Sequence, residues 1–306
     1  MGQGIGNPIV VPEKVNTYDD IREVVKQLRP LPNLNIPNVQ SRQPMSLQIQ
    51  MLALGYFLGV MIGDMSKFPK RRKQYETMSV RLQLSKRHVS NVRFGKYVVR
   101  CAALLGIKMK RIADYIRPDD RPYDAYRWDS QNSELIMWMF KSCLGMNIGK
   151  TTTYHPVNAA WLRSAPPDLQ RSFLQGVADS DGFVDVNKHE AGIIADPNEF
   201  LIGDILEALK VRFRPTVSKG QATVIMSVKQ AYSLPIFNPT VRSHRFVLAK
   251  ALSNATRLWG PWPPWLRHEV DELISSGNSS KEVVLTILKK HGIAIRSQHL
   301  RSRTSR

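Results

Sequence analysis

The sequence has few cysteines and no long apolar run. Only two cysteines, Cys101 and Cys143, occur among 306 residues, and both lie in apolar stretches. Two cysteines without the spacing of a zinc site or a disulfide framework indicate reduced thiols in the core. No apolar run approaches the roughly 20 residues that cross a bilayer, and the N-terminus lacks the basic-then-apolar order of a secretory signal. We therefore expect no membrane partner and an intracellular protein, whether cytoplasmic, nucleoid-associated or organellar.

Acidic residues are also scarce. Lys and Arg number 44 against 25 Asp and Glu, which gives a net charge of +19. So strong a bias predicts a polyanionic partner, with nucleic acid favoured. The charge is unevenly placed, because residues 67–111 hold 14 basic residues and one acid, 289–306 hold six and none, and 184–230 hold six of each. With 42% hydrophobic residues, we expect two or three cored domains that contact the partner mainly through two basic regions.

A short pattern occurs twice, 117 residues apart. Phe57-Leu-Gly-Val-Met-Ile-Gly-Asp64 is matched by Leu174-Gln-Gly-Val-Ala-Asp-Ser-Asp181. Small residues recur at every fourth position of each copy: Gly55, Gly59 and Gly63 in the first, and Ser172, Gly176 and Ser180 in the second. A glycine inside a helix costs about 1 kcal/mol relative to alanine, so this spacing indicates helices whose backbones touch. We predict two closely packed helices that bring Asp64 and Asp181 to one centre.

The two aspartates would lie at the C-terminal ends of their helices. The helix dipole is negative there, so two neighbouring carboxylates should repel unless a cation neutralises them. Oxygen ligands favour Mg²⁺, or another divalent cation such as Mn²⁺, over zinc. The alternative is that Asp64 and Asp181 are ordinary residues of helix-terminal turns.

The pattern of hydrophobic residues predicts the same order of elements in both halves. Periodicity and turn residues predict an N-terminal helix at 18–29, an extended connector up to 46, a helix at 47–64, a basic loop at 67–73, a strand at 78–85, a helix at 89–105, strands at 109–116 and 123–128, and a helix at 133–144. The second half follows with a helix at 168–181, strands at 183–186 and 192–195, a helix at 197–210, strands at 211–218 and 222–228, and a helix at 241–258. We therefore divide the chain into an N-terminal segment (1–46), two αββαββα repeats (47–150 and 151–258), a linker (259–265) and a C-terminal domain (266–306).

The C-terminal domain has its own helical pattern. The linker, Trp259-Gly-Pro-Trp-Pro-Pro-Trp265, cannot be helical. Two helical stripes follow, and Ser279 or Ser280 can begin the second helix. Gly292 then ends it, and Ser297 can begin a third helix with arginines on both sides. This order is typical of a helix-turn-helix unit that brings Arg296, Arg301 and Arg303 to DNA, although a helical hairpin docked on the main body is an alternative.

The repeated motif resembles the LAGLIDADG homing endonuclease family in its two-repeat, single-chain form. Leu174-Gln-Gly-Val-Ala-Asp-Ser-Asp-Gly182 matches the family motif closely, and Phe57-Leu-Gly-Val-Met-Ile-Gly-Asp-Met65 matches it more loosely. The resemblance covers residues 47–258. It implies an α+β fold of two pseudo-symmetric αββαββα halves, packed through the motif helices, whose antiparallel sheets form a DNA-binding saddle. The C-terminal segment adds a small all-α domain.

The resemblance also implies an activity, namely metal-dependent hydrolysis of both strands of a long, asymmetric double-stranded DNA target by a monomer of the intron-homing type. Asp64 and Asp181 would bind Mg²⁺, with Gly63 and Ser180 beside them at the metal centre. The family uses a lysine near the metals, for which Lys86 is the candidate in the first repeat and Lys188 in the second; Lys86 is alternatively one of many lysines on a basic face. The expected DNA-binding residues are Lys67, Lys70, Arg71, Arg72, Lys73, Arg81, Gln83, Lys86, Arg87, Lys188, Arg296, Arg301 and Arg303.

Three features depart from the family pattern. Met65 stands where the first motif usually ends in glycine, and Ile62 replaces the earlier acid of that motif. The second hairpin is short and poor in basic residues, which predicts fewer contacts to its half of the target.

A DNA-binding regulator that does not cleave, or an RNA maturase, is the alternative function on the same scaffold.

Overall fold

The computed structural model describes residues 9–31, 46–72, 75–112, 125–146, 156–258, 261–297 and 300. The first half contains α1 (Tyr18–Gln27), α2 (Leu47–Ile62), β1 (Met65–Arg72), β2 (Tyr75–Ser85), α3 (Ser90–Leu104), β3 (Met109–Ile112), β4 (Ala125–Ser130), α4 (Glu134–Trp138) and the π-helix η1 (Met139–Cys143). The second half contains the 3-10 helix η2 (Ala160–Ser164), α5 (Pro167–Asp181), β5 (Gly182–Asp185), β6 (Glu190–Ile194), α6 (Glu199–Ala208), β7 (Arg214–Ser218), β8 (Gln221–Ser227), α7 (Val228–Ser233) and α8 (His244–Asn254). The chain ends with β9 (Thr256–Arg257), α9 (Pro264–Ser275), α10 (Ser280–His291) and β10 (Ile293–Ala294).

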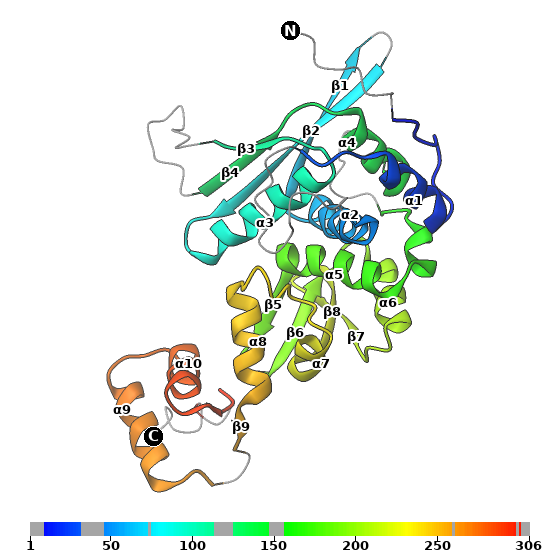
Figure 1. Ribbon diagram of the computed structural model, residues 1–306. Helices are drawn as coiled ribbons and strands as arrows, with labels where there is room; N and C mark the ends of the chain where they lie inside the picture. The colour runs from blue at the N-terminus through cyan, green and yellow to red at the C-terminus, as the bar shows by residue number, and fades with distance from the viewer. Residues whose placement is uncertain are drawn as a thin grey trace.

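Two four-stranded antiparallel sheets form the body of the protein, in the orders β1-β2-β4-β3 and β5-β6-β8-β7. In both sheets the first strand of the half pairs with the second. The fourth strand lies between the second and the third, so the third strand is at the edge. Figure 1 shows α2 and α5 side by side between the sheets. Mixed helices and antiparallel sheets agree with the predicted α+β class, while the symmetry of the two halves stays a prediction.

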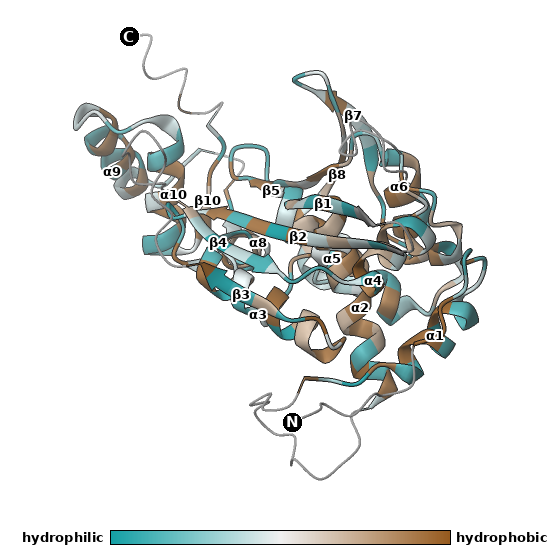
Figure 2. Ribbon diagram, turned by 90° about the horizontal axis from the view of Figure 1, so that it is seen from above, coloured by the Kyte–Doolittle hydropathy of each residue, from teal (hydrophilic) through white to brown (hydrophobic). Residues whose placement is uncertain are grey.

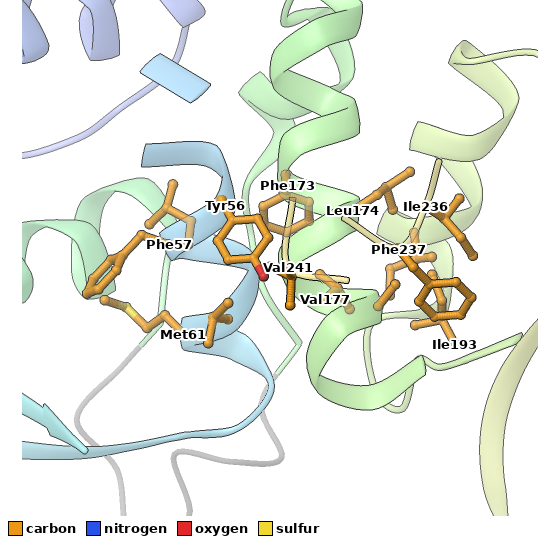
Figure 3. Packing of buried hydrophobic residues seen from close by; sticks show 14 of the residues in the cluster. Tyr56, Phe57, Met61, Phe173, Leu174, Val177, Ile193, Ile236, Phe237 and Val241 are labelled. Atoms are coloured by element: carbon orange, nitrogen blue, oxygen red, sulfur yellow. The ribbon is translucent and has the colours of Figure 1, made fainter. Parts of the chain in front are cut away.

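Helix α2 is apolar on every side because it is enclosed on every side. Leu54, Phe57, Leu58 and Met61 have no exposed surface. The helix contacts the first sheet, α1, α3 and α5, and only its first turn, with Gln48 and Ile49, meets solvent. Figure 3 shows the packed side chains of α2 and α5 from close by. The predicted long helix is confirmed, and its burial explains why every residue after Gln50 except the Tyr56 hydroxyl group is apolar.

The first sheet corrects one prediction. Residues 67–73 were expected to form a basic loop, but β1 runs through Arg72 and pairs with β2 from Met65 opposite Leu82 to Arg72 opposite Tyr75. The basic residues gave no strand pattern, because β1 is stabilised by its backbone pairing with β2. Pro69 fits because β1 is an edge strand, where the missing N–H needs no partner. Lys73 and the side chains of Arg71 and Arg72 lie outside the described residues.

Strand β2 confirms the predicted alternation. Val80, Leu82 and Leu84 are buried towards the helices, whereas Arg81 and Gln83 belong to the opposite face. In Figure 2 hydrophilic residues alternate with apolar ones along β2. The first sheet therefore has one face on the core and one polar, basic face.

The predicted N-terminal helix is present, and it packs against the core. Thr17 and Asp20 form a capping box at the start of α1, and Ile21, Val24 and Val25 are buried. The indole of Trp138 donates a 3.0 Å hydrogen bond to the Pro12 carbonyl oxygen, which fixes the preceding segment. Most of the predicted extended connector, residues 32–45, lies outside the described residues.

The C-terminal segment contains the two predicted helices, but it is not purely helical. Ser279 caps α10 in a capping box with Glu282, and Gly292 ends α10 in the left-handed conformation at φ 65°. After this glycine, β10 pairs in parallel with β9. The third helix expected after Ser297 falls largely on residues outside the description. Figures 1 and 2 show α9 and α10 at one end of the molecule, beyond α8.

No helix among the described residues is long and apolar enough to cross a membrane. Cys101 and Cys143 are both buried free thiols, as predicted.

Candidate functional site

The two motif helices touch through their backbones. A β-carbon built on Gly59 would lie 2.2 Å from the Phe173 carbonyl oxygen, and one on Gly176 would lie 2.2 Å from the Tyr56 carbonyl oxygen. Neither distance is compatible with a side chain, so glycine is required at both positions. The Ser172 hydroxyl group donates a 2.7 Å hydrogen bond across the contact to the Leu52 carbonyl oxygen.

The same contact brings the two motif aspartates together. Asp64 follows Gly63, the C-cap residue of α2, and Asp181 is the last residue of α5. A β-carbon on Gly63 would lie 2.7 Å from Oδ2 of Asp181 and 2.5 Å from the β-carbon of Ser180, so the helix ends are in contact. Burial, followed by the negative charge of Asp181, raises the pKa of Asp64 to about 7. Burial also raises the pKa of Asp181.

Two cations lie close enough to act on these carboxylates. Lys67 of β1 stands opposite buried Val80, on the helix-facing side of the first sheet. Burial lowers the pKa of Lys67 to about 8, and the charge of Asp181 opposes that shift. The charges of Arg245 and then Lys67 in turn lower the pKa of Asp181 against the effect of burial.

Arg245, at the start of α8, is fixed against the end of α5. Its Nη2 donates a 3.1 Å hydrogen bond to the Ser180 carbonyl oxygen, and its Nη1 donates to the Asp179 carbonyl oxygen. The carbonyl groups of a helix end carry partial negative charge, so the guanidinium both caps the helix and offsets its dipole. Arg245 was not predicted, because no spacing relates it to a motif that ends 64 positions earlier.

A buried acid supports the site from behind. Asp179 is 2% exposed and accepts a 2.7 Å hydrogen bond from the Tyr56 hydroxyl group, which crosses from α2 to α5. The backbone N–H of Asn238 also faces this carboxyl group, 3.3 Å from Oδ1. Figure 3 shows the Tyr56 hydroxyl directed away from Phe57 and toward Val241. Burial raises the pKa of Asp179 to about 7, against the Tyr56 hydrogen bond and the charge of Arg245.

The donor set at this centre fits a divalent cation with oxygen ligands. Asp64 and Asp181 supply carboxylates at adjoining helix ends, where burial and then the charge of Asp181 raise the pKa of Asp64. Among the described residues no cluster of three or more His, Cys, Asp and Glu exists, so water or a phosphate oxygen would complete the coordination. The Ser180 carbonyl oxygen accepts from Arg245, and the Ser180 hydroxyl group donates to the Gly176 carbonyl oxygen at 3.0 Å. These bonds engage the polar groups of Ser180 that were predicted to lie at the metal.

The two lysines predicted to be catalytic lie in different surroundings. Lys86 directly follows Ser85, the last residue of β2, four residues beyond Leu82, which is the register partner of Met65. The neighbouring His88 ring stacks on His244 at 3.9 Å, next to Arg245. Lys188, by contrast, is in the turn beyond β5, four strand residues and thus roughly 13 Å or more from Asp181. A direct role of Lys188 at the carboxylates does not fit this position.

The exposed face of the first sheet carries the other predicted DNA contacts that the structure describes. Arg81 is held by Asp129, with 3.0 Å between Nε and Oδ1, and stacks over Phe68 at 4.8 Å. Arg127 donates to the same carboxylate, so Asp129 orients two arginines at once. Gln83, Lys70 and Arg87 are exposed. Arg296 lies near the second sheet, whereas Arg301 and Arg303 lie outside the described residues.

Comparison with solved structures finds chains of similar fold. The homing endonuclease I-DmoI in complex with DNA and Mn has 16% identity over 64% of this chain and 99% of that chain, with a TM-score of 0.42. The homing endonuclease I-WcaI bound to its DNA recognition sequence has 12% identity over 69% and 95%, with a TM-score of 0.43. The N-terminal LAGLIDADG domain of DUF199/WhiA has 11% identity over 78% and 100%, with a TM-score of 0.38.

No protein-family model matches the sequence, and no curated protein matches it. With identities and TM-scores this low, the function proposed below rests on the residues of this chain and not on the likeness to those structures.

Proposed function

We propose that the chain is a monomeric, site-specific double-strand DNA endonuclease of the intron-homing type, which hydrolyses phosphodiester bonds with a divalent metal ion. The observation that carries the proposal is the contact of two helix ends that places Asp64 beside Asp181. Two half-buried carboxylates side by side are unfavourable in a protein that only needs to fold. A bound divalent cation would neutralise the two carboxylates and offset their repulsion.

The chain's own residues have distinct tasks in this proposal. Asp64 and Asp181 hold the metal, and the basic face of the first sheet, with Arg81 and Gln83, positions the duplex above them. A bound Mg²⁺ or Mn²⁺ would stabilise charge on the scissile phosphate and make water more acidic. Lys67, whose pKa is about 8, can hold or release a proton near neutral pH beside Asp181. Arg245 keeps the end of α5 in place through the carbonyl oxygens of Asp179 and Ser180.

A DNA-binding regulator that does not cleave is the second candidate, and one observation favours it. Arg245 already supplies a positive charge to the carboxylates, since it lowers the pKa of both Asp64 and Asp181 against burial. If that charge is sufficient, the acidic pair is stable without a metal. An RNA maturase on the same scaffold would differ from both in its preference for RNA.

The decisive experiment starts from random-sequence duplex DNA. Duplexes retained by the protein are amplified, and the selected sequence is then incubated with the protein in Mg²⁺, in Mn²⁺ and in EDTA. We expect breaks on both strands in either metal and intact DNA in EDTA. Asp64→Asn and Asp181→Asn should bind the duplex and leave it intact.

The matched control is Asp168→Asn, which removes an exposed carboxylate from the first turn of α5, where it pairs with Arg171 at 3.1 Å. This variant should cleave as the unchanged protein does. Cleavage that persists in EDTA or in both active-site variants would disprove a metal nuclease. Tight binding without breaks in any metal would establish the regulator, and preferential retention of RNA the maturase.

A further inference from the structure

A pocket of about 370 Å³ lies where the second sheet meets the C-terminal segment. The β5–β6 turn supplies Lys188 and His189, the segment that leads into β7 supplies Arg212 and Arg214, and the C-terminal segment supplies Arg257 and Arg296. Glu190 is the one acid in this lining, against five lysines and arginines. The pocket is therefore strongly positive and fits an anionic ligand.

The charge of the second sheet itself makes this pocket significant. Glu190 and Ser227, and Arg214 and Ile225, are register partners, so they share the face that is turned away from the core. Arg214 donates from Nη2 to both oxygens of Glu190 at 3.0 Å, so its charge is largely balanced on that face. Asp185, the register partner of Glu190, adds a further negative charge. This face has little to offer a polyanion compared with the first sheet.

The C-terminal segment is joined to this face by defined contacts. Thr256 donates from its backbone N–H to the Gly292 carbonyl oxygen at 2.9 Å, next to the paired strands β9 and β10. The buried ring of His189 lies with Nε2 3.4 Å from the Ile295 carbonyl oxygen. These contacts set Arg257 and Arg296 at fixed places beside the β5–β6 turn.

We propose that this pocket binds backbone phosphates of the duplex that runs over the sheets, so the C-terminal segment completes the half of the DNA interface that the second sheet leaves poorly charged. This inference rests on the DNA binding in the proposed function but not on cleavage. Lys188 then has a phosphate as its ligand, at the far end of β5 from the carboxylates. Arg212 and Arg257 are both exposed and can reach a phosphate without unfolding any element.

The test uses the full-length protein and the duplex selected above, with Arg212→Gln, Arg257→Gln and Arg296→Gln singly and together. Each phosphate contact that is lost should lower the slope of log affinity against log salt by about 0.9. We expect each single change to weaken binding roughly threefold to tenfold in 0.1 M salt. Hydroxyl-radical protection should be lost at the end of the duplex that lies over the second sheet and kept over the first. The rate of cleavage at saturating protein should be unchanged.

Lys250→Gln, which removes an exposed charge of α8 outside the pocket, is the matched control and should keep the full footprint. Because Arg296 is half-buried and its loss can disturb folding, the pair of exposed changes, Arg212→Gln with Arg257→Gln, is judged alone if the triple variant does not fold. Unchanged affinity and salt slope in that pair would overturn the inference. Hydroxyl-radical protection that is lost evenly along the duplex would also overturn it. If the protein binds and protects the duplex but never cuts it, the nuclease proposal fails while this inference stands. If no duplex is bound, both fail.

Discussion

The Tyr56 hydroxyl group donates a 2.7 Å hydrogen bond to Oδ2 of Asp179, across 123 residues of chain. The bond joins the two motif helices directly behind the carboxylates that we propose to hold metal. Tyr56 has no exposed surface and Asp179 is 2% exposed, so this hydrogen bond is fully buried. The geometry of the proposed metal site therefore depends on a pair that lies behind it.

Tyr56→Phe should show how much this pair stabilises the fold. The change removes one buried hydrogen bond and keeps the ring, so the free energy of unfolding should fall by about 1–3 kcal/mol. Urea denaturation at pH 7 measures it. Tyr126→Phe is the control, because it removes a hydroxyl group from a half-buried tyrosine of β4. Equal stability losses in the two variants would show that the Asp179 bond has no special weight.

Gly59→Ala and Gly176→Ala should separate the motif helices. Each added methyl group would meet a backbone carbonyl oxygen at 2.2 Å, and backbone cannot give way as a flexible side chain does. We expect a loss of about 3 kcal/mol or more in the free energy of unfolding, at the upper end for overpacked cores.

Gly203→Ala in α6 is the matched control for these helix glycines. Its β-carbon would lie 3.2 Å from the ring carbon Cζ of Phe213, a side chain that can shift. Stability there should change by less than about 1 kcal/mol, because alanine also favours the helix. Thermal unfolding of the three variants gives the comparison, and a tolerated Gly59→Ala would contradict the close helix contact.

Much of this architecture could be predicted from sequence, since local patterns encode it. Glycines at every fourth position predicted the helix contact, and the alternation in 78–85 predicted β2. Strand β1 was missed because five of the seven residues in 67–73 are basic and Pro69 interrupts them, so only pairing with β2 makes it a strand. Arg245 was missed because its partners are backbone carbonyl oxygens, which have no signature in the sequence.

Arg245→Gln should uncouple DNA binding from cleavage. Hydrogen bonds from a charged donor contribute about 1.5–3 kcal/mol, so loss of the positioned end of α5 should lower the cleavage rate roughly 10-fold to 100-fold. Duplex affinity should change little, because Arg245 faces α5. Single-turnover cleavage and equilibrium binding of the same duplex separate the two effects. Arg242→Gln, three residues earlier and outside α8, is the control.

Asp129→Asn should remove a pH-dependent part of the stability of the first sheet. Burial raises the pKa of Asp129, but hydrogen bonds and charges of Arg127 and Arg81 outweigh burial and hold it below its usual value. A carboxyl group with a lowered pKa stabilises the fold above its unfolded pKa, and this contribution is lost as pH falls through the folded value.

The unchanged protein should therefore exceed Asp129→Asn by about 1 kcal/mol at pH 7, a modest value for a partly exposed ion pair. The gap should close as the pH falls below about 4. Urea denaturation at pH 7, 5 and 3 tests this sign. A gap that is constant across these pH values would mean that shape, and not charge, accounts for the role of Asp129.

Lys67 and Lys86 are competing candidates for the lysine that serves the carboxylates, and their surroundings predict which one acts. Lys67 has a pKa of about 8, set by burial against the attraction of Asp181, so both of its protonation states are accessible near neutral pH. We expect Lys67→Met to lower the cleavage rate about 100-fold or more, the range for a positioned proton carrier, at nearly unchanged duplex affinity. Lys86→Met should instead weaken binding and its salt dependence, as for a phosphate contact. The pH profile distinguishes a proton carrier from a mere counter-charge, because only the unchanged protein and Lys86→Met should then show a rate that changes with pH near 8. The opposite outcome is that Lys86→Met abolishes cleavage at unchanged affinity, while Lys67→Met still cleaves but binds the duplex more weakly. In that case Lys86, the lysine assigned from the motif alone, is the one that serves the carboxylates.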